Sequence, residues 1–276
     1  MSTYPHLDYS EPVSQLINAG DPRDQSEWPN YLDLYGLNSS HVPDLIRMAL
    51  DEELSTSDSD SAEVWAPLHA WRALGQLGAA EAVQPLLSLM HRVDDDGDDW
   101  VGEDLPIVFG LIGPAAIPAL ADYLSDHDHG LWARIAVLVG LNEIAKRHPE
   151  VRADCAAVIV RALERFDEND ETMNAELVSA LAEFRQPETY DLVERAFQAQ
   201  KVDFSVNGDW EDFQVEVGLL DERITPDPDY GFLPENFFAD RSSFEQRKSH
   251  SKEDKKVKSK RKQEKQSRKK NRKKKK

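Results

Sequence analysis

Cysteine and positive charge are scarce in most of this sequence. Its 276 residues contain a single cysteine, Cys155, so no internal disulfide can form. The helical spacing of its apolar neighbours predicts that Cys155 lies in the core. Residues 1–245 hold only 15 Lys and Arg against 49 Asp and Glu, a formal charge of −34. A body of this charge repels nucleic acid and anionic membranes, so we do not expect it to bind either.

Long apolar runs are missing as well. The first ten residues, MSTYPHLDYS, have neither the basic start nor the apolar stretch of a secretory signal. No continuous apolar run approaches the roughly 18 residues of a membrane span. With 40% hydrophobic residues the chain can still bury a sizeable core. We therefore expect a cytoplasmic protein of a reducing compartment, or a nuclear one if the source is a eukaryote.

What the sequence does contain is a series of short amphipathic segments that come in pairs. Residues 62–78 predict one helix that ends at Gly78, and residues 83–91 predict a second that ends near His91. Because neither apolar stripe can be buried by this pair alone, the pairs must stack. In the first and least regular pair, Ser39 or Ser40 would cap the second helix. The first helices of the pairs end at Leu37, Leu77, Ile112, Ile144 and Phe184.

These ends lie about 35 residues apart, and such a period predicts an all-α fold, a right-handed α-solenoid. Two segments carry a resemblance. LGAAEAVQPLL, residues 77–87, and IGPAAIPAL, residues 112–120, resemble the HEAT-like repeats of the phycobilisome-lyase type (PBS lyase HEAT-like repeats), in which Gly closes one helix and Ala-Val/Ile-x-Pro opens the next. Pro85 and Pro118 stand several residues into their helices, so we expect late helix starts or bends there.

The resemblance leaves two kinds of function open. A stacked helical repeat most often provides a binding surface, which implies a non-catalytic scaffold or adaptor for a protein partner. The alternative is a lyase-like enzyme or assembly factor that attaches a chromophore or cofactor. The sequence has no nucleophile with a paired base and no Gly-rich phosphate loop, so it favours the scaffold, and we predict no catalytic residue and no cofactor.

Four regions are expected along the chain. A β-prone run, residues 201–206, precedes a helix capped by Asp209, and Trp210, Phe213 and Val217 share one face of that helix. Such an element can close the last open layer of a solenoid. The predicted regions are a flexible N-terminal arm (1–30), the solenoid (31–220) with its terminal cap (205–220), a linker rich in Pro and aromatic residues (221–245) and a disordered Lys/Arg-rich tail (246–276).

The acidic loop DDDGDD, residues 94–99, has some of the spacing of a calcium loop. With Gly97 at the sixth position, Arg92 occupies the first position, where it would repel the ion. His127 and His129 belong to a second loop, and we predict no metal site at either loop. We expect the acidic loop to contact a basic partner or the chain's own tail. The residues expected to contact a protein partner are Trp100, Trp132, Asp94, Asp95 and Asp96.

The last 31 residues give the clearest indication of function in the sequence. Residues 246–276 carry 18 Lys and Arg against 3 Asp and Glu, a formal charge of +15. They contain almost no apolar side chain, so we expect them not to fold alone. A run of cations binds phosphates by releasing counterions. Without aromatic residues to stack on bases, sequence recognition is not expected.

Several partners for this tail remain open. It is expected to contact RNA, DNA or a ribonucleoprotein such as the ribosome without sequence preference. It could instead fold back on the acidic body, lie on a membrane surface or have no defined partner. The residues expected to make the anionic contact are Lys255, Lys256, Lys258, Lys260, Arg261, Lys262, Arg268, Lys269, Lys270, Arg272 and Lys273.

Overall fold

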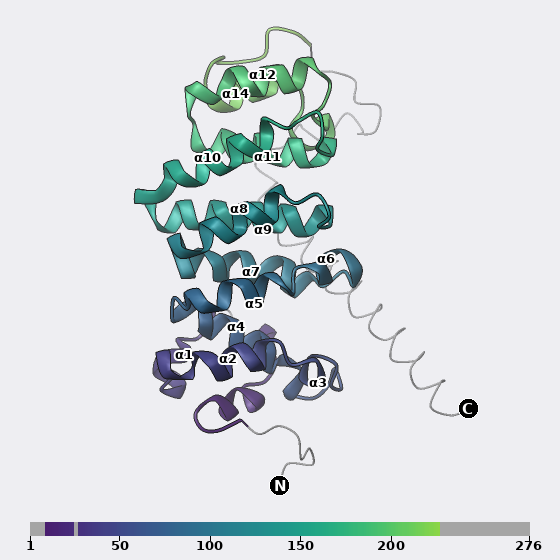
Figure 1. Ribbon diagram of the computed structural model, residues 1–276. Helices are drawn as coiled ribbons and strands as arrows, with labels where there is room; N and C mark the ends of the chain where they lie inside the picture. Colours follow the sequence, from purple (N-terminus) through teal and green to yellow (C-terminus); the bar gives the residue numbers. More distant parts are fainter. Residues whose placement is uncertain (1–8, 25–26, 227–276) are drawn as a thin grey trace, which may run out of the picture. The chain divides into compact units, whose positions relative to one another are not determined.

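The computed structural model describes residues 9–24 and 27–226, and Figure 1 shows their helices. Within these residues the backbone is mostly helical and has no β-strand. The helices of the two packed series are α4 (Ala66–Gln76), α5 (Val83–Leu87), α7 (Asp99–Ile112), α8 (Ile117–Ser125), α9 (Leu131–Arg147), α10 (Arg152–Leu163), α11 (Glu171–Phe184) and α12 (Tyr190–Gln198). The others are α1 (Tyr31–Tyr35), α2 (Val42–Ala49), α3 (Glu52–Ser55), α6 (His91–Asp95), α13 (Phe204–Asn207) and α14 (Trp210–Val217).

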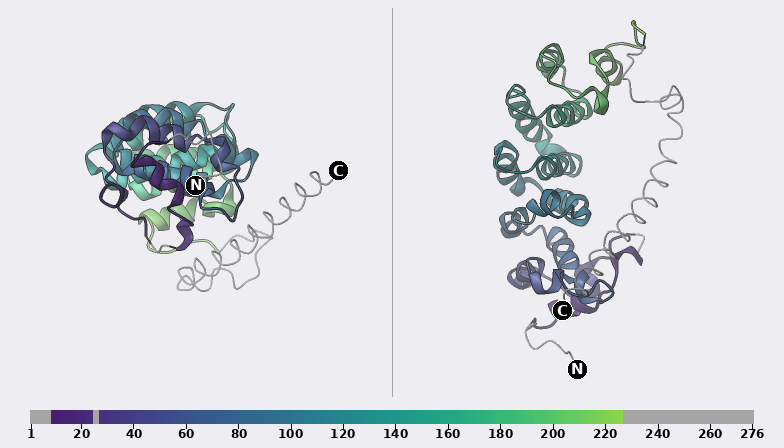
Figure 2. Two further views of the ribbon diagram at one scale, coloured as in Figure 1. Left: turned by 90° about the horizontal axis from the view of Figure 1, so that it is seen from below. Right: turned by 90° about the vertical axis from the view of Figure 1, so that its right-hand side faces the viewer.

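These eight helices form two series, and each series packs in the order in which its helices occur along the chain. In one series α4 packs against α7, α7 against α9, and α9 against α11. In the other, α5 packs against α8, α8 against α10, and α10 against α12. The two series also touch, because α9 contacts both α8 and α10, and α10 contacts α11. Figure 2 shows the two series side by side in its right-hand view. Each helix therefore buries its apolar side chains against near neighbours in the sequence.

The connection between α4 and α5 shows how the first helix of a pair ends and the second begins. Gly78 follows α4 with φ +62°, in the left-handed region that a glycine adopts without strain. The Ala79 N–H then donates to the Leu74 carbonyl at 3.1 Å, which ends the helix. A 3₁₀ turn precedes α5, so Pro85 is only the third residue of α5, and Pro118 is the second residue of α8. The late helix starts predicted from these prolines are confirmed.

The core runs through both series of helices without interruption. Leu74, Leu105, Leu120 and Leu181 are fully buried in a single apolar cluster with their neighbours. Cys155 is also fully buried, as predicted, and this burial raises the pKa of its thiol to about 11. Its thiol is therefore a small core group and not a reactive thiolate at neutral pH.

Three local predictions are wrong. The helix predicted at residues 83–91 ends at Leu87, and a turn separates it from α6, which begins at His91. Neither Ser39 nor Ser40 caps the helix that follows them, because Asn38 accepts the Ser40 N–H at 3.0 Å instead. The β-prone run at residues 201–206 contains the start of helix α13, because the Asp203 carboxylate caps it. The predicted cap at Asp209 is confirmed.

The stretch from Asp99 to Ser125 is, among the described residues, the one long and apolar enough to cross a membrane by length and composition. A core helix passes the same test, so one such stretch is weak evidence for a membrane span. In the structure it consists of two helices, α7 and α8, with a 3₁₀ turn at Gly113–Ala116 between them. The first of these helices packs against α4 and α9.

Candidate partner-binding surface

Asp94, near the end of α6, accepts hydrogen bonds from the first turn of α9. Its Oδ1 atom accepts the backbone N–H of Trp132 at 3.1 Å, and its Oδ2 atom accepts that of Ala133 at 2.9 Å. The N-cap residue of α9 is Gly130, which has no side chain to cap the helix. A Cβ atom at Gly130 would lie 2.1 Å from Asp94 Oδ2, so the glycine also makes room for the carboxylate. Asp94 thus provides the cap that α9 lacks in its own sequence.

The side chain of Trp132 lies on the surface next to this cap. Trp132 is 55% exposed, whereas most large apolar side chains of the described residues are buried. Asp95 and Asp96 directly follow Asp94 and are exposed, and their carboxylates make no hydrogen bond or ion pair with the described part of the chain. The structure therefore brings Trp132 and the acidic loop together. We call Trp132, Asp95 and Asp96 the Trp132 surface.

Trp100, the other aromatic residue expected at a partner contact, packs inward. Its ring lies edge-on to Trp65, with the ring centres 5.5 Å apart, and the Arg72 guanidinium is 5.9 Å from the Trp100 ring centre. It is partly buried against the core. The structure thus places Trp100 in an interior cluster rather than with Trp132.

That interior cluster is built around a buried ion pair which sequence patterns did not indicate. Arg72 on α4 and Asp104 on α7 are 4% and 5% exposed, and Arg72 Nε donates to Asp104 Oδ2 at 2.6 Å. Trp71 Nε1 donates to the same oxygen at 3.3 Å. The Arg72 guanidinium also lies 4.5 Å from the ring centre of Trp28. The cluster joins α4, α7 and the segment before α1, so it is a structural support and not an open site.

His69 and Tyr31 extend this cluster. His69 Nε2 is 2.8 Å from the Gly20 carbonyl oxygen, which only accepts, so Nε2 carries the proton. Tyr31 therefore donates its hydroxyl hydrogen to His69 Nδ1 at 2.7 Å. Burial lowers the pKa of His69 and raises that of Tyr31 to about 12. Both side chains are thus neutral at neutral pH.

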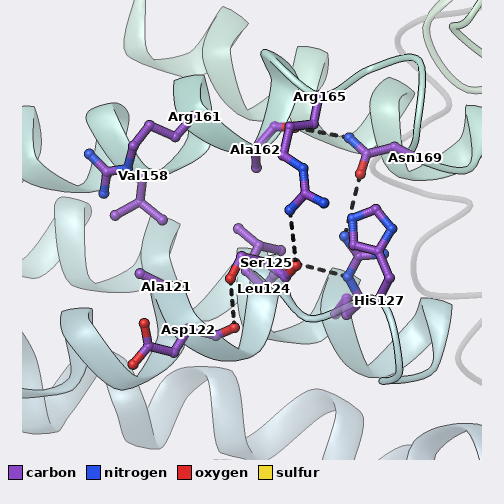
Figure 3. A pocket seen from close by; sticks show the side chains of 11 residues that line it. Ala121, Asp122, Leu124, Ser125, His127, Val158, Arg161, Ala162, Arg165 and Asn169 are labelled. Carbon is purple, nitrogen blue, oxygen red and sulfur yellow. Dashed lines mark hydrogen bonds between the residues drawn. The ribbon is translucent and has the colours of Figure 1, made fainter.

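A pocket of about 250 Å³ lies between α8, α9 and α10 (Figure 3). Its lining includes three of the 15 basic residues of positions 1–245, and sequence reasoning did not single out any of them. Their spacing along the chain carries no recognisable motif. The lining residues are Ala121, Asp122, Leu124, Ser125, His127, Arg134, Val158, Arg161, Ala162, Arg165 and Asn169.

The two loop histidines have separate environments. The His129 ring stacks on Tyr123 with ring centres 3.6 Å apart and an interplanar angle of 4°. His127 lines the pocket. Within residues 9–24 and 27–226, no group of three or more His, Cys, Asp or Glu side chains could hold a metal ion.

The Lys/Arg-rich tail, from Lys255 to Lys273 and beyond, lies outside the described residues, as does most of the predicted linker. No protein-family model, curated protein or solved structure matches this chain. Function is therefore inferred from the side chains themselves.

Proposed function

We propose that residues 31–220 form an α-solenoid of HEAT-like helix pairs which acts as a non-catalytic scaffold for a protein partner. The support is the order of packing, in which α4, α7, α9 and α11 touch in turn, as do α5, α8, α10 and α12. In a stack of this kind each pair contacts its neighbours and leaves its outer faces exposed. Those faces are the surfaces on which such repeats bind partners.

The observation that carries the proposal is the exposed ring of Trp132 on a firmly capped helix. The backbone N–H groups of Trp132 and Ala133 donate to the Asp94 carboxylate, and these two hydrogen bonds fix the backbone that bears the ring. A rigid aromatic side chain at the surface is typical of the few residues that contribute most to a protein–protein interface. Asp95 and Asp96, which follow Asp94 in the chain and are exposed, favour a partner that presents an apolar residue next to Lys or Arg.

The tail supplies a second, separate contact. Residues 246–276 carry a formal charge of +15, and the remainder of the chain carries −34. A polyanion such as RNA or DNA is attracted by the first charge and repelled by the second. The scaffold would thus hold a basic protein on its body and a nucleic acid or ribonucleoprotein on its tail.

Crosslinking at the Trp132 surface tests the scaffold. A photoreactive residue at the exposed position 128, near Trp132 in the sequence, is introduced into otherwise wild-type protein and into Trp132→Ala. Crosslinked proteins from the native cell extract are then identified by mass spectrometry. We expect a basic protein to crosslink to the wild type. This protein should not crosslink to Trp132→Ala or to the double variant Asp95→Asn/Asp96→Asn.

Leu34 provides the matched control. It is a 59% exposed apolar side chain outside the Trp132 surface, so Leu34→Ala should leave the crosslinked protein unchanged. A partner retained by Trp132→Ala, or lost equally from Leu34→Ala, would show that the Trp132 surface is not the docking site.

A further inference from the structure

The pocket between α8, α9 and α10 contains a buried cation without a counter-ion. Arg134 is 6% exposed, and no carboxylate lies within 4.0 Å of it among the described residues. Its Nε atom donates to the Leu124 carbonyl at 2.9 Å, and Nη2 reaches the Asn169 side-chain oxygen only at 3.5 Å. A guanidinium has five N–H donors, so most of those of Arg134 have no protein partner among the described residues, and its Nη1 atom is not fully buried.

A buried charge in this state is costly unless an anion pairs with it. Burial, together with the nearby Arg165, lowers the pKa of Arg134. The protein therefore holds two cations close together in a partly closed space. An anion between them would offset both the desolvation of Arg134 and the repulsion between the two arginines.

Arg165 and His127 complete the cationic side of the pocket. Figure 3 shows Arg165 directed toward Ser125, and its Nη1 atom donates to the Ser125 carbonyl at 3.3 Å. His127 faces the same space, where burial, Arg134 and Arg165 lower its pKa. Arg161 lies beside Val158 at the other side of the pocket.

The nearby carboxylates only partly balance these charges. Asp122 lines the pocket, and Asp126 is close enough to act on His127 and Arg134. Glu168 pairs with Arg165 at 2.6 Å, but both side chains of that pair are about half exposed. An exposed pair of this kind is weak, so an anion of higher charge can displace Glu168 from Arg165.

We propose that this pocket binds a phosphate monoester or inorganic phosphate between Arg134 and Arg165, with His127 and Arg161 at its edge. A phosphate monoester carries a charge of about −1.5 to −2 and three acceptor oxygens, which matches two or three guanidinium groups. A diester of a nucleic-acid backbone carries a single charge and fits this site less well. No residue of the Trp132 surface lines the pocket, so its test does not depend on the proposed scaffold function.

Binding to the full-length chain is measured by calorimetry with four probes: inorganic phosphate, a short phosphoserine peptide, the same peptide without phosphate, and dimethyl phosphate. We expect saturable binding of at least one of the first two. Arg165→Gln should weaken it by about tenfold, because one charge-assisted contact is lost. Arg195, an exposed arginine on α12 outside the pocket, is the matched control, and Arg195→Gln should have no effect.

The His127 ring gives a readout that is local to the pocket, because His127 lines it. A dianion next to the ring favours the imidazolium form, so the pKa of His127 should rise when phosphate binds. This shift is followed by NMR and assigned with His127→Gln. Tighter binding of the phosphopeptide would identify a phosphorylated side chain as the ligand, and tighter binding of inorganic phosphate would identify a free anion.

Three results would overturn the proposal. The first is the absence of saturable binding by both phosphate probes. The second is equal affinity of Arg165→Gln, Arg195→Gln and wild type, with no movement of the His127 signal. The third is dimethyl phosphate binding as tightly as the monoester, which would point to a nucleic-acid backbone instead. Circular dichroism of Arg165→Gln verifies the fold, and the exposure of Arg165 makes unfolding unexpected.

Discussion

The Nε atom of Arg72 on α4 donates to Asp104 Oδ2 on α7 at 2.6 Å, with both side chains more than nine-tenths buried. This pair connects two successive helices of one series at a point where apolar contacts would otherwise be continuous. A buried pair contributes little net stability compared with a good apolar replacement. Removal of one partner, however, leaves the other as a buried charge without a counter-ion. The pair is therefore a sensitive position for stability measurements.

Asp104→Ala should lower the free energy of unfolding by about 3–5 kcal/mol, because Arg72 is left buried and unpaired. Urea unfolding followed by circular dichroism measures the change. The control is Asp44→Ala, which removes an exposed pair with Arg47 and should cost less than about 1 kcal/mol. Equal losses for the two variants would show that the Arg72–Asp104 pair is not effectively buried.

Asp94→Ala should lower the free energy of unfolding by about 1 kcal/mol, because the first N–H groups of α9 lose their cap. Asp95→Ala removes the same charge one residue later and should stay within about 0.5 kcal/mol of the wild type. The comparison separates capping from general charge effects. If both variants lose the same stability, Asp94 does not cap α9.

Gly130→Ala tests the same contact from the other side. The new Cβ atom would meet Asp94 Oδ2 at 2.1 Å, so the substitution should destabilise the wild-type protein. In an Asp94→Ala background the clash is removed, and Gly130→Ala should cost less there. A double-mutant cycle by urea unfolding measures this coupling. The close approach would be contradicted if the two substitutions were additive.

Acid should destabilise the protein through His69. Burial holds the folded-state pKa of His69 below its usual value of 6.5, so the unfolded chain binds the proton more readily. Stability from this residue is complete above about pH 6.5 and falls below it by up to about 1.4 kcal/mol per pH unit. Urea midpoints of wild type and His69→Gln, compared above and below that pH, should show a smaller acid loss in the variant. An identical loss would assign the acid sensitivity to other groups.

Sequence periodicity predicted the helices well because the core side chains recur at helical spacing. Leu74, Leu105 and Leu120, each on a different helix, are examples and are fully buried. The position of Asp94 could not be predicted, because its partners at Trp132 and Ala133 are 38 and 39 residues away in the chain. Only the packing of α6 against α9 brings them together.

The pocket could not be predicted from the sequence either, because its residues are also far apart in the chain. Arg134, Arg161 and Arg165 come from two helices and a turn, and their spacing matches no phosphate-binding motif. Their rarity was the available signal, since positions 1–245 contain only 15 basic residues. In an acidic chain, basic residues that gather at one place are informative, but the gathering itself is visible only in three dimensions.

The most direct test of the proposed separation between a protein-binding body and a polyanion-binding tail compares the full chain with residues 1–245. Binding of a non-specific RNA to each is measured over an approximately tenfold range of salt concentration. We predict that the full chain binds with an affinity that falls steeply as salt rises, and that residues 1–245 do not bind. RNA binding by residues 1–245 that equals that of the full chain and persists at high salt would contradict the account.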